Sequence, residues 1–313
     1  MNAEELKQSG PEADSHRQKK IKYYKFILIF TLSVLVLGMV YLAIFHAKTG
    51  EFMYKDVTLT GGVSLTVYTN SSADNAQIAQ EIIKEIPSLI KSDILIRKIT
   101  DIQTGKQLAV SIDAKISSEE DITKVKNALS GIFGFALDDT NSNVEFTGAT
   151  LGTSFYNELL KALALAFLFM AIVVFLIFRN FIPSIAVVLC AVTDIFLTLA
   201  IVNLIGLHLS MGGISAFLML VGYSVDTDIL LTTRILKRRE PGIEERHKSA
   251  IKTGLTETIT SIVSVLIGFF LVTSPMLKEV FIVLTIGLFV DIFGTWLQNA
   301  SILRLYCYKK NIN

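Results

Sequence analysis

Long runs of apolar residues divide this chain of 313 residues. The stretches 26–47, 162–178 and 258–277 contain no Asp, Glu, Lys or Arg. About 20 mostly apolar residues are enough to cross the hydrocarbon core of a bilayer. The pattern therefore predicts an α-helical polytopic membrane protein. The expected spans are residues 26–46, 159–178, 183–205, 214–236, 255–273 and 280–303.

The long segment between the first two spans, residues 47–158, has a different pattern. Strand-like alternation of period two and helix-like spacing follow one another along it. Pro87 stops the first helical pattern, and the acids that follow Ser118 are typical of a helix start. The resulting order is β-α-β-β-α-β, the ferredoxin-like motif. The expected strands are 56–69, 94–102, 107–114 and 144–147, and the expected helices are 73–86 and 117–132.

Basic residues flank the spans unevenly, which predicts the orientation of the chain. By the positive-inside rule, clusters of Lys and Arg mark cytoplasmic segments. Both termini and the loop after the fourth span should then be cytoplasmic, and residues 47–158 external. The basic residues are Arg17, Lys19, Lys20, Lys22, Lys25, Lys237, Arg238, Arg239, Arg246, Lys248, Lys252, Arg304, Lys309 and Lys310. The expected units are a tail (1–25), the first span (26–46), the external domain (47–158), a helical bundle (159–305) with a cytoplasmic loop (237–254), and a tail (306–313).

The composition favours a transport role over an enzymatic one. The two cysteines, Cys190 and Cys307, have no metal-ligand spacing, and the four histidines are scattered. No Gly-Lys-Ser/Thr phosphate loop is present. We therefore expect no catalytic residue, no metal and no cofactor. Any energy input should come from an ion gradient or a partner.

Ionisable residues inside the apolar spans are the main candidates for function. One of them costs roughly 2.5–3.5 kcal/mol at the centre of a bilayer, so such residues usually serve a site. The candidates for proton or ion coupling are Asp194, Asp226, Asp228 and Asp291. At 100° per residue, Asp226 and Asp228 point to nearly opposite faces of a helix. We expect Asp194, Asp226 and Asp291 to form the coupled network, which leaves Asp228 a packing role.

Further polar and small residues lie near these acids. Arg234 is interpreted as a topology anchor or a carboxylate partner, and Glu257 as a solvated residue near the cytoplasmic interface. Asp291 could instead only hydrogen-bond a Ser or Thr of a neighbouring helix. Small residues such as Gly222 allow close packing of helices. Such residues are compatible with helices that slide past one another as gates, and equally with close packing alone.

Several motifs resemble the SecF branch of the SecD/SecF family, the accessory subunits of the Sec protein-translocation channel. DVTLTGGVSL at 56–65, with Asp56, Gly61 and Gly62, is similar to the family element that begins the external domain. FTGATLG at 146–152 resembles the element before the second span, and Thr193-Asp194 resembles the His-Asp pair of the third. VGYSVDT at 221–227, with Gly222, Tyr223, Ser224 and the later Arg234, resembles the signature of the fourth span.

Three positions depart from the bacterial pattern. Ala149 stands where the family usually has proline. The acid that follows Asn in bacterial members is shifted one residue earlier, to Asp226, and Glu257 replaces an Arg of the fifth span. An Asp–Arg pair between these two spans is therefore not available. The pattern DTDILL at 226–231 resembles the archaeal branch.

The resemblance implies a fold, a function and partners. The fold would be one six-span half of a transporter of the resistance–nodulation–division (RND) type, with an α+β ferredoxin-like external domain. The chain would act with SecD at the Sec channel to promote export or membrane insertion of proteins, coupled to an ion gradient through Asp226. Its partners would be SecD, the channel, exported or membrane-inserted polypeptides and membrane lipids, with no nucleic acid. Its location would be the cytoplasmic membrane.

Two other functions are compatible with the same spans. Half of an RND-type exporter of lipids or small molecules would need a wide apolar cavity in the external domain. A scaffold that only stabilises a partner complex would tolerate neutral replacements of every intramembrane acid. Co-purification with a partner of similar topology and with channel subunits favours the first function over both.

Overall fold

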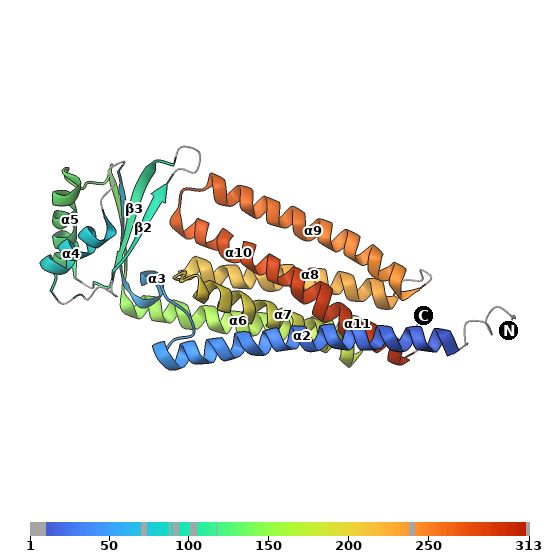
Figure 1. The fold of residues 1–313 in the computed structure, drawn as a ribbon. Coiled ribbons are helices and arrows are strands. Elements are labelled where there is room, and N and C mark those ends of the chain that lie inside the picture. Colours follow the sequence, from blue (N-terminus) through green and yellow to red (C-terminus); the bar gives the residue numbers. More distant parts are fainter. Residues whose placement is uncertain are drawn as a thin grey trace.

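The computed structural model describes residues 11–69, 74–87, 89, 94–100, 105–116, 118–237 and 242–310. Its helices and strands form two parts (Figure 1): a long bundle of helices, and a sheet with two helices at one end of that bundle. Six helical segments are long and apolar enough to cross a membrane. The prediction of six spans plus one α+β domain is therefore confirmed in its elements.

The bundle is built from long helices whose apolar sequence makes any other backbone state costly in lipid, where each unpaired peptide group would cost several kcal/mol. The predicted spans 183–205 and 214–236 agree with the helices to within three residues at both ends, and the other four lie within longer helical segments or overlap them. The helices are α2 (Pro11–Thr49), α6 (Ala149–Phe178), α7 (Phe181–Leu204), α8 (Met211–Lys237), α9 (Ile243–Leu271) and α10 (Pro275–Phe293), followed by the π-helical segment η2 (Gly294–Asn299) and α11 (Ala300–Lys310).

Several helices extend beyond the predicted spans. The polar residues 11–25, expected as a tail, are part of α2, and α6 begins ten residues before 159. The stretch 243–254, expected within a loop, is the first part of α9. Hydropathy marks only the part of a helix that lipid can surround, and polar turns continue beyond it. The predicted basic residues Arg238 and Arg239 lie outside the described residues, as do residues 1–10 and 311–313.

The α+β part has the predicted β-α-β-β-α-β order. Its strands form an antiparallel sheet in the order β2-β3-β1-β4, so the first and third strands of the chain are central. A one-turn helix precedes the first strand where a continuous strand was expected, because Asp56 caps it. The elements are α3 (Val57–Thr60), β1 (Gly62–Tyr68), α4 (Asn75–Glu85), β2 (Ile94–Thr100), β3 (Gln107–Ala114), α5 (Glu119–Phe133) and β4 (Ser142–Thr147).

The two faces of the sheet differ in chemistry because side chains alternate along each strand. Val63 and Leu65 of β1 and Ile112 of β3 are buried against α4 and α5. The opposite face carries polar side chains, among them Ser64 and Asp113, which are paired across the strands. Because α4 and α5 cover only the apolar face, the polar face is left toward the helical bundle (Figure 1).

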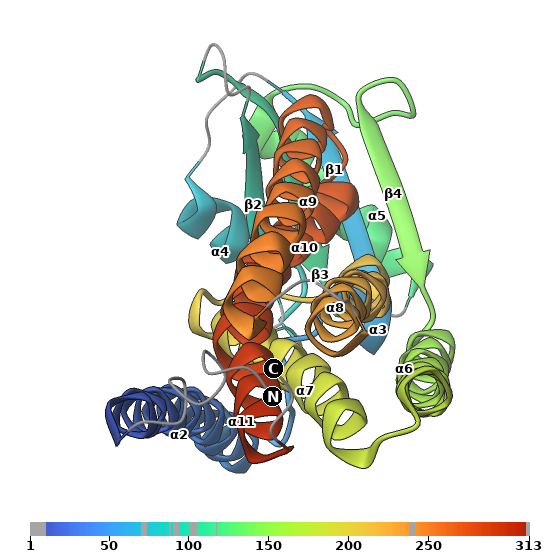
Figure 2. The ribbon, with the colours of Figure 1, turned by 90° about the vertical axis from the view of Figure 1, so that its right-hand side faces the viewer.

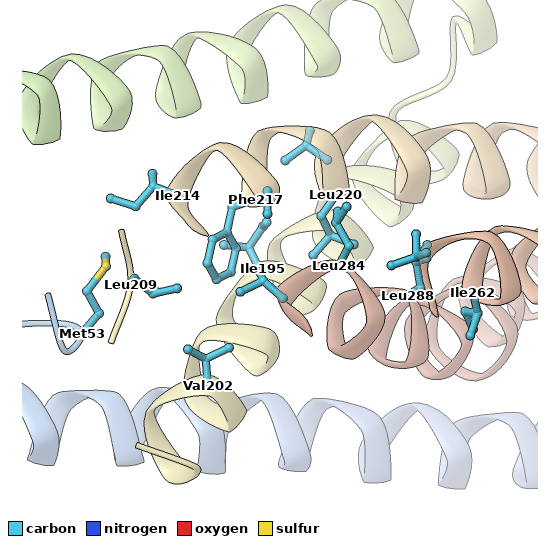
Figure 3. Close-up of a cluster of buried hydrophobic side chains, with 14 of the residues drawn as sticks. Met53, Ile195, Val202, Leu209, Ile214, Phe217, Leu220, Ile262, Leu284 and Leu288 are labelled. Carbon is cyan, nitrogen blue, oxygen red and sulfur yellow. The ribbon is translucent and has the colours of Figure 1, made fainter. Parts of the chain in front are cut away.

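The bundle has its own apolar core. Figure 3 shows Phe217 and Leu220 of α8 next to Leu284 and Leu288 of α10, with Ile195 of α7 beside them. All of these side chains are buried. Viewed along the bundle (Figure 2), α8 lies between α6 and the pair α9 and α10. The start of α2 and the end of α11 lie together at the end of the bundle far from the sheet (Figure 1).

Candidate intramembrane carboxylate site

Three carboxyl groups from three helices meet inside the bundle. Asp194 comes from α7, Asp228 from α8 and Asp291 from α10, and each has a relative exposure of 0%. Helices α7, α8 and α10 pack against one another, and this packing brings together acids that are up to 97 residues apart in the sequence. We call these three residues the carboxylate cluster.

Hydroxyl and amide groups surround the carboxylate cluster. Ser224 Oγ donates to Asp194 Oδ2 at 2.6 Å. Thr295 Oγ1 lies 3.0 Å from Asp228 Oδ1 and 3.1 Å from Asp291 Oδ1. Asn299 Nδ2 donates to Asp228 Oδ1 at 2.7 Å. The site is therefore built from oxygen atoms and neutral donors.

The π-helical segment η2 supplies two of these donors. A π-helical turn adds a residue to the helix and often marks a functional site. Gly294 begins this segment, and a Cβ there would lie 2.5 Å from Asp194 Oδ1 and 2.9 Å from Cys190 Sγ. The absence of a side chain at Gly294 thus leaves the space that the Asp194 carboxyl group occupies.

The structure places Asp226 apart from the carboxylate cluster. It confirms that Asp226 and Asp228 face apart, because Asp228 is fully buried whereas Asp226 is exposed on the surface of α8. The expected grouping of Asp226 with Asp194 and Asp291 is therefore wrong, and Asp228 is the α8 acid that lies beside those two residues. A helical wheel shows that two residues diverge, but only the neighbouring helices decide which of them points inward.

The remaining residues proposed from the fourth and fifth spans lie around Asp226. Gly222 and Tyr223 are exposed on the same side of α8, and Glu257 is exposed on α9. Among the described residues, Arg234 forms no ion pair with a carboxylate; it donates to the carbonyl oxygen of Ser249 at 2.8 Å and to its hydroxyl at 2.9 Å. That contact holds the end of α8 against the start of α9.

A second set of charged groups lies in the α+β part of the chain, near its junction with the bundle. Arg97 of β2 pairs with Asp56 at 3.1 Å and also with Asp113 of β3. Burial raises the pKa of Asp113 to about 6; the negative charge of Asp56 adds to this effect and Arg97 partly offsets it. A cavity of about 460 Å³ is lined by both of these acids and by basic residues such as Lys55.

Backbone contacts continue this connection into the membrane helices. Asp56 N–H donates to the carbonyl oxygen of Leu209, and Leu209 N–H donates to that of Tyr54. Glu279, buried near the start of α10, accepts from the backbone N–H of Ser210 at 2.7 Å. The external domain is thereby attached to the loop before α8 and, through it, to α10.

The two family motifs that flank the external domain in the sequence lie against each other. Gly61 has φ +86°, and a Cβ there would lie 2.3 Å from Ala149 Cα. A Cβ on Gly152 would lie 3.0 Å from the backbone of Leu59. Gly62 also has positive φ, at +144°, and its missing side chain faces the carbonyl oxygen of Ala114. These glycines permit α3 to pack directly on the start of α6.

Of the neutral residues in the intramembrane site, the sequence motifs include Ser224 but not Thr295 or Asn299. Thr295 and Asn299 follow Asp291 by four and eight residues, so all three lie on one helical face. That spacing is the signal in the sequence that could have revealed them. Arg97 and Asp113 gave no comparable signal, since a charged residue on a strand is ordinary.

Comparisons with known proteins identify a family and several proteins to which this chain is similar. The profile described as "Protein export membrane protein SecD/SecF, C-terminal" matches residues 126–309. The SecF protein of Methanocaldococcus jannaschii is 36% identical over 91% of this chain and 96% of its own length. That of Pyrococcus furiosus is 33% identical over 96% of this chain and 98% of its own.

A solved structure shows the same fold. The crystal structure of SecDF, a translocon-associated membrane protein from Thermus thermophilus, matches with a TM-score of 0.69 and 19% identity. The match covers 93% of this chain and 38% of the SecDF chain. The fold is therefore SecDF-like: a bundle of membrane-length helices with one α+β domain.

The chain belongs to the SecD/SecF family of protein-export membrane proteins, within its SecF members. This membership confirms a multi-pass membrane protein of protein transport rather than an enzyme, and its relatives include archaeal proteins.

Proposed function

We propose that this chain acts with a SecD partner at the Sec channel to promote the export or membrane insertion of proteins. Its family membership supports this function, as does its match to 38% of a SecDF chain that is described as translocon-associated. A SecD chain would supply the membrane helices that this chain lacks relative to SecDF.

The exposed polar stripe on α8 is the observation that carries the proposal. Gly222, Tyr223 and Asp226 recur at helical spacing on one side of α8, and all three are exposed. An acid facing lipid near the middle of a span would cost roughly 2.5–3.5 kcal/mol. Cover by helices of a partner would remove that cost, and this supports the side of α8 with Asp226 as the surface for SecD.

The energy for export would come from an ion gradient acting on carboxyl groups of α8. The sequence contains no phosphate-binding loop of the Gly-Lys-Ser/Thr type. Asp226 at the partner surface and Asp228 in the bundle are the α8 residues able to change charge. Protonation of such a group changes its preferred environment, and this can bias two arrangements of the helices.

The orientation follows from the charges at the two ends of the bundle. One end of the bundle, far from the sheet, contains the start of α2, the start of α9 and the end of α11 (Figure 1). All three segments are rich in basic residues. The positive-inside rule makes that end cytoplasmic. Both termini would then be cytoplasmic, and the α+β domain would meet the emerging polypeptide outside the membrane.

Replacement of Asp226 by asparagine tests the proposed function. In cells that depend on this chain, Asp226→Asn should cause unprocessed secretory reporter to accumulate to nearly the level seen without the chain, while the protein itself persists in the membrane. Asp139→Asn, the same change at an exposed position of the external domain, should leave export normal. Normal export in the Asp226 variant would remove this residue from the mechanism.

Recovery of partners tests the two alternatives. Purification of the tagged chain from native membranes should yield SecD together with subunits of the Sec channel. An exporter would instead be recovered with lipids or small molecules and without the channel. The cavity at the external domain is lined by charged as well as apolar residues, which does not favour that alternative.

A further inference from the structure

An apolar cavity of about 480 Å³ lies among α2, α6, α7 and α8, near the end of the bundle that carries the sheet. Figure 3 shows Met53, Ile214 and Phe217, three of the buried side chains that line it. Among the described residues that line it, only Tyr156 has a polar side chain. We call this space the apolar cavity. Such a lining favours a hydrocarbon group as its occupant.

The cavity of about 460 Å³ at the external domain, which we call the charged cavity, contains groups of both signs. Its ammonium and carboxyl groups come from Lys55, Lys115, Glu51, Asp56 and Asp113. Asp56 and Asp113 already pair with Arg97. Glu51 pairs with Lys55 at 2.6 Å but is half exposed, and an exposed ion pair contributes little. The ammonium groups can therefore bind a further anion, and Glu51 can accept a hydrogen bond from a group beside that anion.

The charged cavity and the apolar cavity adjoin each other. Met53 lines both of them. On α2, Leu42 lines the apolar cavity and Phe45, almost one turn later, lines the charged cavity. Lys55 Nζ lies 4.0 Å from the centre of the Tyr156 ring, so a charge of one cavity rests on a side chain of the other. Together they form an amphipathic site.

The backbone holds Lys55 at the boundary of this site. Asp56 N–H donates to the carbonyl oxygen of Leu209 at 2.9 Å, and Leu209 N–H donates to that of Tyr54 at 2.8 Å. This segment follows the end of α2 and contacts the loop before α8, where two membrane-length helices end. Lipid head groups lie at this level of a bilayer. A group that is held in place before binding loses little freedom when the ligand arrives.

The size and lining of the apolar cavity disfavour a polypeptide as its occupant. An α-helix with side chains is about 10–12 Å across and rises about 5.4 Å per turn, so each turn fills roughly 400–600 Å³. The cavity has room for about one turn. An extended peptide would bring N–H and C=O groups into a space that offers them almost no partners. A flexible hydrocarbon chain has no such groups to satisfy.

We propose that the two cavities together bind one phospholipid at the junction of the external domain and the bundle. Its phosphate contacts Lys55 and Lys115, because lysine binds phosphate as a point charge. An amine or hydroxyl group of the same head group lies beside Glu51, and one hydrocarbon chain enters the apolar cavity between α2 and α6. The site is separate from the carboxylate cluster and from the side of α8 with Asp226, and it does not depend on the proposed function.

Native mass spectrometry of the purified full chain tests the head-group contacts. The delipidated chain is incubated with dioleoyl phosphatidylethanolamine or with dioleoylglycerol, which has the same hydrocarbon chains and no phosphate. One phosphatidylethanolamine should be retained on the order of tenfold more tightly than dioleoylglycerol, because the charged hydrogen bonds are lost without the phosphate. Lys55→Gln should weaken its retention by a similar factor. Lys48→Gln is the control, since Lys48 is exposed on α2 and lines neither cavity.

Ala164→Trp tests the apolar cavity in the same assay. Ala164 lines the cavity from α6, and a tryptophan there would occupy the space of the hydrocarbon chain. Retention of phosphatidylethanolamine should fall on the order of tenfold, while circular dichroism shows unchanged helix content. Ala162→Trp is the matched control, because Ala162 is exposed about 200° away around α6 and does not line the cavity.

Several results would overturn the proposal. They are equal retention of the two lipids, no retained lipid, or equal retention of phosphatidylethanolamine by the two tryptophan variants. A photoreactive amino acid in place of Ala164 identifies the occupant in native membranes, where the cross-linked chain should gain the mass of one lipid. A cross-link to SecD or to a translocating polypeptide would assign the cavity to that occupant instead. Because an exporter is distinguished by the absence of the channel, a retained lipid alone does not favour that alternative.

Discussion

Asp113 has a carboxyl group whose pKa lies far from its ordinary value. Its ordinary pKa of 3.8 is raised to about 6, chiefly by burial on the inner face of the sheet. A carboxyl whose pKa is raised by folding stabilises the folded state fully below its unfolded pKa, and this stabilisation is lost as pH rises through the folded pKa. The contact between Arg97 and Asp113 therefore holds a carboxylate whose ionisation is costly.

We predict that this group makes the chain more stable in mild acid. Between about pH 6 and pH 4, Asp113 should contribute on the order of 2 kcal/mol as it becomes protonated. Thermal unfolding of the purified chain, followed by the signal of the external domain, should shift to higher temperature over that interval. Asp113→Asn should flatten the dependence and Asp139→Asn should not; an equal slope in the Asp113 variant would contradict the prediction.

Single residues also explain why the intramembrane site needs its particular neighbours. Gly294 leaves space for Asp194, and Thr295 contacts two acids with one hydroxyl group. Composition would count these as one glycine and one threonine among many. Their importance comes from where the π-helical segment places them.

The contact between α3 and α6 connects the domain to the membrane at the level of elements. Gly61 combines a positive φ with a distance of 2.3 Å from its missing Cβ to Ala149 Cα. An alanine side chain would thus meet both backbone strain and a backbone clash. Each costs roughly 1–3 kcal/mol, and the clash requires α3 to move away from α6.

We predict that Gly61→Ala loosens the attachment of the external domain. Amides of α3 and β1 should exchange hydrogen for deuterium on the order of tenfold faster or more in the full chain, since 1.4 kcal/mol equals a factor of ten. Gly134→Ala is the matched control, because Gly134 also has positive φ (+77°) but open space around its Cβ position. If the two variants change amide exchange equally, backbone strain alone explains the effect and the contact between α3 and α6 contributes nothing.

The helix boundaries show where the apolar pattern of the sequence no longer predicts the ends of the helices. The helix α9 continues through the polar residues 243–254, where Arg246 is buried and donates to the carbonyl oxygen of Ile235 at 3.2 Å. Its packing against α8, with Arg234 on Ser249, stabilises turns that hydropathy assigned to a surface loop. Tertiary contacts thus lengthen a helix beyond its lipid-facing part.

The whole molecule presents a polar surface in a place that lipid would not tolerate. Gly222 has nothing within 4 Å of its missing Cβ, so this chain alone does not use the space beside it. Tyr223 and Asp226 border that space on the same side of α8. A partner helix packed there would benefit from the missing side chain, as small residues allow backbones to approach closely.

We predict that Gly222→Trp blocks the partner without unfolding this chain. Co-purification of SecD should fall on the order of tenfold, because overpacking at a helix contact costs about 1–3 kcal/mol. The amount of the chain in the membrane should stay unchanged. Leu168→Trp, at an exposed apolar position of α6, is the control, and undiminished recovery of SecD with the Gly222 variant would place the partner elsewhere.

The sequence by itself determined the elements and the chemistry available to them. Apolar runs of span length must form helices in a bilayer, and alternation with turn residues fixed the order of strands and helices in the external domain. It also identified Asp194, Asp228 and Asp291, because acids in apolar spans are rare. These features are local in the chain, so local patterns reveal them.

Only the tertiary structure decided which of these acids act together. The divergence of Asp226 and Asp228 follows from helical geometry, yet the choice of Asp228 for the interior depends on how α8 rotates against α7 and α10. Arg97 and Asp113 likewise meet Asp56 only when β2, β3 and the start of α3 are brought together by the fold of the α+β part. Such contacts join residues far apart in the chain, and their energies depend on burial that no local pattern specifies.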